Sequence, residues 1–102
     1  MKVTEFQTQI VPLLNAVHAA LQHDDGSITR LTAVGDAMIR TLNFMSEAYD
    51  QITDADARTQ IEITAEQMLS ALAVNNTRIG MAIQSAAELA AVMADATLVT
   101  IH

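Results

Sequence analysis

The sequence predicts an all-α protein that forms a single domain over residues 1–102. Hydrophobic residues make up 51% of the chain but aromatic residues only 3%. A core must therefore come from Leu, Ile, Val, Met and Ala, which favours closely packed helices over a sheet sandwich. One proline and three glycines are too few to divide the chain into many strands. Apolar residues also recur every three or four positions over most of the length, which is the spacing of an amphipathic helix.

The first helix is expected to run from Thr4 to about His23. Thr4 and Gln7 have the spacing of a capping box. The apolar stripe that follows consists of Phe6, Ile10, Leu13, Val17 and Leu21. Pro12 lies inside this stripe, and we expect a kink there rather than a helix that begins at residues 11–12, because no capping residue directly precedes Pro12. Residues 24–27, Asp-Asp-Gly-Ser, predict a turn.

The second helix is expected to begin after Ser27, which can act as its N-cap. Its apolar stripe repeats every seven residues at Leu31, Met38, Met45 and Ile52, with Val34, Leu42, Ala48 and Tyr49 beside it. Ile39 and Phe44 make this stripe wider than a two-helix seam, so the helix should contact more than one neighbour. Its methionines are interpreted as core residues rather than as metal or cofactor ligands.

The third helix is expected to begin at residues 53–56, where acidic residues suit the first turn of a helix. Its stripe alternates spacings of four and three: Ala65, Met68, Leu72, Asn75, Ile79, Ala82, Ala86, Leu89, Met93 and Ala96. The spacing does not change across AVNNTRIG (residues 73–80), which predicts one helix over residues 54–97, about 65 Å long. A break near Asn76 is the alternative, and it would allow a four-helix bundle. Residues 98–101 are expected to be a frayed end or an edge segment.

The length of such a helix predicts an oligomer, because a three-helix chain of this size has too little interior for its apolar surface. Ala82, Ala86, Ala90 and Ala94 are spaced by four and allow close approach of another helix. Met81 and Ile83 flank them, so the helix is apolar nearly all round. We expect an oligomer interface at Ala82, Ala86, Ala90 and Met93. Its partner is either the first helix or the same helix of a second chain. We favour a homodimer that resembles a coiled coil.

The charge of the chain limits its partners. With a net charge of −7 and only 5 basic residues, the chain is not expected to bind nucleic acid directly. An anionic membrane surface is disfavoured for the same reason. No signal peptide and no membrane span are recognised, so we expect a cytoplasmic protein. With no cysteine, the chain has no disulfide and no thiolate site.

The acidic residues cluster around the second predicted turn. The acidic corner consists of Glu47, Asp50, Asp54, Asp56, Glu62 and Glu66, with only Arg58 among them. It is interpreted either as a solvated, capped helical corner or as a patch that binds a basic partner protein. The spacing matches no calcium loop.

Three polar residues in AVNNTRIG form the other candidate site. Asn75 occupies a core position, where one polar residue can set helix register and oligomer state. Arg78 lies beside it and can reach a carboxylate on a neighbouring helix. The alternative is that Asn75, Asn76 and Arg78 from several chains bind an anionic or nucleotide-like ligand.

Catalysis is not expected. His18, His23 and His102 are interpreted as structural or surface residues, because His23 and Asp25 alone are too few ligands for a metal. No nucleophile motif or phosphate loop is present, and no cofactor is expected.

The sequence therefore favours a non-catalytic, oligomeric helical protein that binds a basic protein through its acidic corner. A nucleic-acid-handling partner would make the chain an inhibitor or nucleic-acid mimic, of the kind that mobile elements encode. The alternatives are the small-ligand site at Asn75 to Arg78 and a structural or secretion-chaperone subunit.

Overall fold

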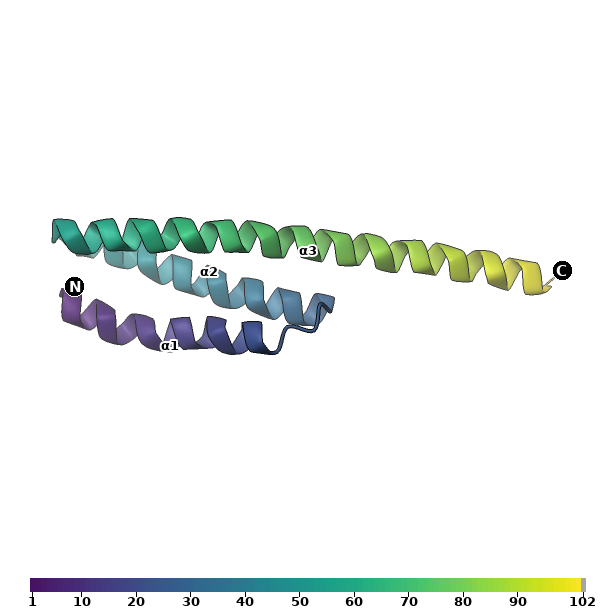
Figure 1. The fold of residues 1–102 in the computed structure, drawn as a ribbon, viewed down its shortest axis with the longest axis horizontal. Helices are drawn as coiled ribbons and strands as arrows, with labels where there is room; N and C mark the ends of the chain where they lie inside the picture. The colour runs from purple at the N-terminus through teal and green to yellow at the C-terminus, as the bar shows by residue number, and fades with distance from the viewer. Residues whose placement is uncertain (102) are drawn as a thin grey trace.

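The computed structural model describes the backbone of residues 1–101 and the side chains of residues 1–95. Three helices follow one another: α1 (Val3–Gln22), α2 (Ile28–Gln51) and α3 (Ala55–Ile101). Because residues 1–101 contain no strand, the all-α prediction is confirmed. The molecule measures 72 × 19 × 16 Å, and its length comes from α3, which extends far beyond the other two helices (Figure 1).

α1 begins at Val3, and Lys2 at its N-cap makes no side-chain cap hydrogen bond. The predicted capping box of Thr4 and Gln7 is therefore wrong, because Thr4 already lies inside the helix. Tertiary packing explains the earlier start, since Val3 packs against the core. The helix continues through Pro12, so the alternative start at residues 11–12 is also wrong.

The turn between α1 and α2 is held by its own side chains. The Asp24 carboxylate accepts a hydrogen bond from the Gly26 N–H at 2.8 Å, and Asp25 accepts one from the Ser27 N–H at 2.9 Å. Gly26 has a φ of +79°, a conformation that residues with a Cβ rarely adopt. The Ser27 hydroxyl accepts the Arg30 N–H at 3.2 Å, which confirms the predicted cap of α2.

α2 lies between the other two helices and contacts both, as the width of its apolar stripe predicts. One core cluster joins the N-terminal part of α1 to the end of α2 and the start of α3, and its buried members are Ile10, Met45, Ala48, Ile52 and Ile61. The other lies nearer the α1–α2 turn and consists of Val17, Val34 and Met38. Phe6 of α1 stacks on Phe44 of α2, with ring centroids 5.6 Å apart.

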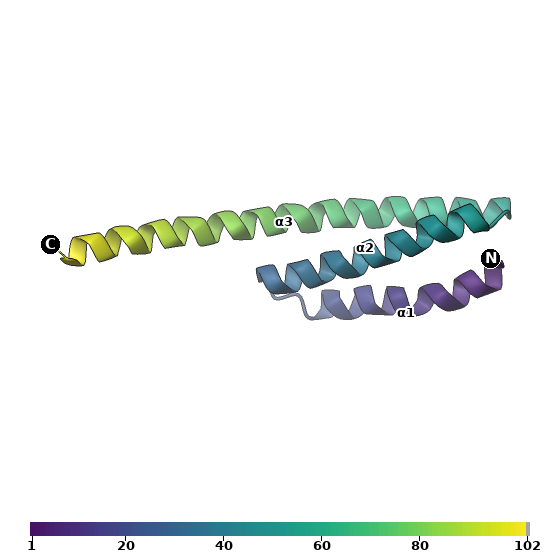
Figure 2. The same cartoon turned by 180° about the vertical axis from the view of Figure 1, so that it is seen from behind.

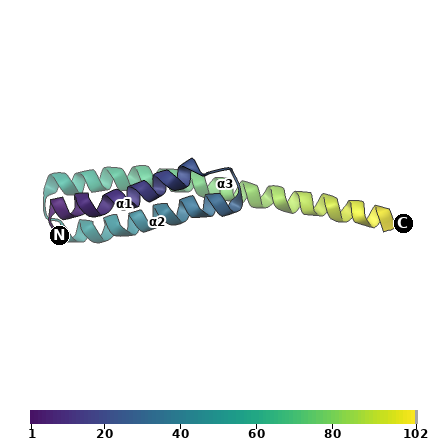
Figure 3. The same ribbon diagram turned by 90° about the horizontal axis from the view of Figure 1, so that it is seen from below.

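α3 is one helix of 47 residues, so the chain does not break near Asn76 and the four-helix alternative is wrong. Asp54 caps it by accepting the Ala57 N–H at 2.9 Å. The helix runs to Ile101, so the expectation of a frayed or extended segment at residues 98–101 is wrong for the backbone; the side chains there lie outside the described ones. In the described chain, the C-terminal part of α3, drawn from green to yellow, has no other helix beside it (Figures 2 and 3). We call residues 80–101 the projecting half of α3.

Candidate functional site

The acidic corner lies where α2 ends and α3 begins, at the end of the molecule opposite the C-terminus (Figure 1). Glu47 and Asp50 belong to the last turns of α2, and the other members belong to the turn and to the first turns of α3. All six residues are exposed: Glu47, Asp50, Asp54, Asp56, Glu62 and Glu66. They include half of the 12 acidic residues of the chain, so this end of the molecule presents a negative surface to solvent.

Two members of the acidic corner have structural roles. Asp54 is the N-cap of α3. Glu62 accepts a hydrogen bond from the Tyr49 hydroxyl at 2.6 Å, and this bond raises the pKa of Tyr49, with desolvation by burial as the next cause. The guanidinium of Arg58 lies over the Tyr49 ring, 4.1 Å from its centroid, as a cation–π contact. Tyr49, Arg58 and Glu62 thus tie the end of α2 to the start of α3.

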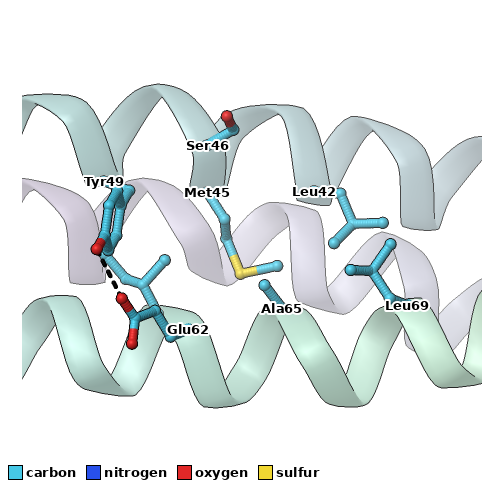
Figure 4. Close-up of a pocket in the computed structure, with 8 residues that line it drawn as sticks. Leu42, Met45, Ser46, Tyr49, Glu62, Ala65 and Leu69 are labelled. Carbon is cyan, nitrogen blue, oxygen red and sulfur yellow. Dashed lines mark hydrogen bonds between the residues drawn. The ribbon is translucent and has the colours of Figure 1, made fainter.

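An apolar hollow of about 500 Å³ lies beside this cluster, between α2 and α3. Its lining residues are Leu42, Met45, Ser46, Tyr49, Ile61, Glu62, Ala65 and Leu69. Figure 4 shows Leu42 and Leu69 facing each other across it, with the Tyr49–Glu62 hydrogen bond at one end and α1 behind. Leu69 is 54% exposed. The hollow is therefore an apolar surface open to solvent and bordered by a carboxylate.

Asn75 is buried, at 4% exposure, and it binds within its own chain. Its side-chain amide donates a hydrogen bond to the Leu31 carbonyl of α2 at 2.9 Å. Gly35 leaves room for this contact, because a Cβ at that position would lie 3.3 Å from the Asn75 Nδ2, which is tighter than most Cβ contacts. The polar residue in the apolar stripe therefore sets the position of α3 along α2, and Asn76 beside it is exposed.

Arg78 binds the turn between α1 and α2. Its guanidinium contacts the Asp24 carboxylate through two nitrogens, at 2.5 Å and 3.4 Å. The Asp24 side chain is only 11% exposed, whereas that of Arg78 is 46% exposed. The hydrogen bond from Arg78, followed by the one from the Gly26 N–H, lowers the pKa of Asp24 from its usual 3.8. Arg78 thus reaches a neighbouring carboxylate, as the sequence suggests, and the polar groups of both Asn75 and Arg78 are engaged inside the chain.

We expect Arg78→Gln to raise the pKa of Asp24 toward its ordinary value, because the variant loses the main group that lowers it. A carboxyl with a lowered folded-state pKa stabilises the fold above its unfolded-state pKa and loses that effect as the pH falls through the lowered value. The stability difference between wild type and Arg78→Gln should therefore be largest near neutral pH and shrink in acid. NMR titration of the Asp24 carboxyl, with Arg30→Gln as the control, measures the shift. An unchanged Asp24 pKa in Arg78→Gln would contradict this prediction.

The other candidate residues lie apart from these features. His18 and His23 are exposed, and His18 lies 3.1 Å from the Gln22 side-chain nitrogen. His102 lies outside the described residues. Within the described part of the chain, no group of three acidic or histidine side chains is arranged to hold a metal ion. None of the described helices is long and apolar enough to cross a membrane.

The predicted oligomer interface lies on the projecting half of α3. Ala82 is half-buried, Ala86 and Ala90 are exposed, and Met93 is 61% exposed. Within one chain, α1 does not reach these residues, since α1 ends beside the other half of α3 (Figure 3). The first helix of the same chain is therefore not their partner.

Comparison with protein families, with curated proteins and with solved structures gives no match to this chain. Its candidate sites therefore depend on geometry alone. Sequence reasoning identified the acidic corner but missed the hollow next to it, because Leu42 and Tyr49 were assigned to the apolar stripe of the second helix. The exposed Leu69 belongs to no predicted stripe, and that was the available signal.

Proposed function

We propose that this chain is a non-catalytic binding protein that takes up a basic, amphipathic helix of a partner protein between α2 and α3. One observation carries the proposal: the apolar hollow formed by Leu42, Met45 and Leu69 is bordered by the carboxylate of Glu62, a member of the acidic corner. A helix with leucine-type side chains on one face and Lys or Arg on the other matches both surfaces. Proteins that handle nucleic acids are rich in such basic segments, so they are the class of partner we favour.

The geometry supports an apolar anchor and a charged rim rather than charge alone. The hollow of about 500 Å³ accommodates large apolar side chains, and anchors of this kind supply most of the binding energy of an interface. Glu62 lines the hollow and Glu66 lies one turn further along α3, and both are exposed, so they are placed to steer a basic segment and to fix its orientation. The small-ligand alternative has less support, because Asn75 and Arg78 already bind Leu31 and Asp24.

The experiment uses a synthetic amphipathic helix of Leu and Lys as the probe, labelled for fluorescence anisotropy. We expect the wild-type chain to bind it, more weakly as salt rises. The double variant Glu62→Lys/Glu66→Lys should weaken binding at least about tenfold, because like charges then face each other. Leu69→Asp should weaken it similarly by placing a charge at the anchor.

The matched control is Glu88→Lys/Asp95→Lys, which changes the net charge by the same amount on the projecting half of α3. This variant should bind nearly as well as the wild type. Equal loss in both double variants would show that only net charge matters and would contradict the proposed site. The same pair of variants then serves for affinity capture of the natural partner from a host lysate.

A further inference from the structure

The most exposed large apolar side chains of α3 repeat along one side of the helix. Val74, Met81 and Val92 are 62%, 63% and 64% exposed. Together with smaller or polar neighbours they follow helical spacing as one outer stripe: Ala71, Val74, Arg78, Met81, Ser85, Glu88 and Val92. This outer stripe differs from the stripe that faces the core of the bundle. It runs from the bundle into the projecting half, so one partner surface can cover both.

The bundle itself is open on the side where α1 and α3 face each other. Two hollows lie along this α1–α3 groove, one of about 290 Å³ near Leu21 and Val74 and one of about 150 Å³ near Leu14 and Thr64. Met38 and Met45 of α2 line them as well. The backbones of α1 and α3 each lie close to α2 but make few close approaches to each other, and Ile10 and Ile61 meet only in the core cluster near Met45. This is the arrangement of a four-helix bundle that lacks the helix opposite α2.

The exposed area of the chain is large enough for a stable interface. A folded monomer of 11.0 kDa exposes about 5,600 Å², whereas this chain exposes 7026 Å². The excess of about 1,400 Å² is greater than the ~800 Å² that each partner buries in a standard interface. An isolated helix in water is also marginal without packing on its apolar face. The projecting half of α3 therefore needs a partner along its length.

We propose that the projecting half of α3 fills the α1–α3 groove of a second copy of this chain, with the two α3 helices antiparallel. Length supports this occupant. α2 has 24 residues and α3 has 47, so the three-helix bundle covers about half of α3 and leaves a segment of matching length. Reciprocal exchange then completes a four-helix bundle at each end of the dimer.

The proposed dimer has a two-fold axis near Arg78. This axis also explains why the core-facing apolar stripe of α3 keeps the same phase along the whole helix. This axis is perpendicular to the plane of the two α3 helices, so both bundles lie on the same side of that plane. The same stripe of α3 must therefore face a core in both halves, and the stripe does continue from Ile79 to Ala82 and Ala86 without a change of phase. Ala71 of one copy then lies opposite Ser85 of the other, and Thr64 lies opposite Val92.

The axis brings the two Arg78 side chains close together. Each is already paired with its own Asp24, so the two cations do not meet as unpaired charges. The projecting half contributes few charges of its own, since Glu88 and Asp95 are its only charged side chains in residues 80–95. The surface is thus suited to an apolar contact between identical helices.

Light scattering after size-exclusion chromatography should give twice the chain mass for the wild type at micromolar concentration. Val74→Glu and Val92→Glu should each raise the dimer dissociation constant at least about a hundredfold, because each buries an unpaired carboxylate. The matched control is Ala91→Glu, which adds the same charge one residue along and about 100° round the helix, and it should remain dimeric. Circular dichroism checks that all three variants keep their helix content. A monomeric wild type, or equal loss in Ala91→Glu, would overturn the proposal.

Cysteine cross-linking tests the orientation, since the natural chain has no cysteine. Ala71→Cys and Ser85→Cys, mixed and oxidised, should form a disulfide-linked heterodimer, because an antiparallel pair places these positions together. Parallel helices would instead link Ala71→Cys to itself. Self-linking of Ala71→Cys alone, or a mixture without heterodimer, would overturn the antiparallel arrangement. The hollow between α2 and α3 lies on the other side of the bundle, so these outcomes do not decide the proposed partner site.

Discussion

Asn75→Asp should destabilise the protein by about 3 kcal/mol or more at neutral pH, because it places an unpaired carboxylate in a buried site. The side chain at this position is 4% exposed and faces the Leu31 carbonyl at 2.9 Å. A carboxylate has no hydrogen to donate to that oxygen, so two negative groups would lie in contact. Urea unfolding of the variant and the wild type measures the loss.

The pH dependence of this loss has a definite sign. Burial beside a carbonyl raises the folded-state pKa of the introduced carboxyl above its unfolded value of about 3.9. The difference in free energy of unfolding between Asn75→Asp and the wild type should be complete above the folded-state pKa. It should disappear as the pH falls below the unfolded-state pKa. A protonated carboxyl can donate to Leu31 in acid.

Asn75→Leu is the matched control for this variant. In an α-helix the carbonyl of residue 31 also accepts the N–H of residue 35, so removing the amide leaves the Leu31 oxygen with a partner. We expect a loss of only about 1 kcal/mol for Asn75→Leu at all pH values. Losses of equal size in Asn75→Asp and Asn75→Leu would show that the amide is needed for its hydrogen bond and not for its lack of charge.

The positions of the three helices were predictable from the sequence, because the capping residues and the spacing of apolar residues agree with the tertiary packing. Ser27 and Asp54 cap the helices that their positions suggest, and the apolar spacing across AVNNTRIG continues because residues 73–80 are one stretch of helix. The prediction failed at Thr4, where a good local signal competes with packing. The contact of Val3 with the core outweighs the capping box and starts α1 earlier.

The sites were less predictable than the helices, because they depend on pairs of residues that are distant in sequence. Asn75 was recognised as a polar residue in an apolar stripe, but its partner is a backbone carbonyl 44 residues away. Every residue has a backbone carbonyl, so a sequence pattern cannot indicate which one accepts the hydrogen bond. Gly35 leaves room for the Asn75 side chain, but nothing in the sequence distinguishes it from other residues of the helix. The hollow between α2 and α3 likewise requires the facing of Leu42 and Leu69, which only the packing angle of two helices decides.

Met45→Ala should lower the free energy of unfolding by about 2–5 kcal/mol, because Met45 is 1% exposed and its removal leaves a cavity where all three helices meet. The same change at Met81, which is 63% exposed in one chain, has a different expected result. In a Val92→Glu background, where the dimer is lost, Met81→Ala should change stability by less than about 0.5 kcal/mol.

In the wild-type background Met81→Ala should act on association instead. The unfolding midpoint of a dimer rises with protein concentration, and truncating an interface side chain reduces that rise by weakening the dimer. Thermal unfolding over a range of concentrations, for Met81→Ala with and without Val92→Glu, separates the two effects. If Met81→Ala has the same effect in both backgrounds, Met81 is only a surface residue and the outer stripe of α3 is not covered by a second copy. Met45→Ala should lower the free energy of unfolding by several kcal/mol at every protein concentration, whereas the effect of Met81→Ala should depend on concentration. This difference would assign Met45 to the core of one chain and Met81 to the contact between two chains.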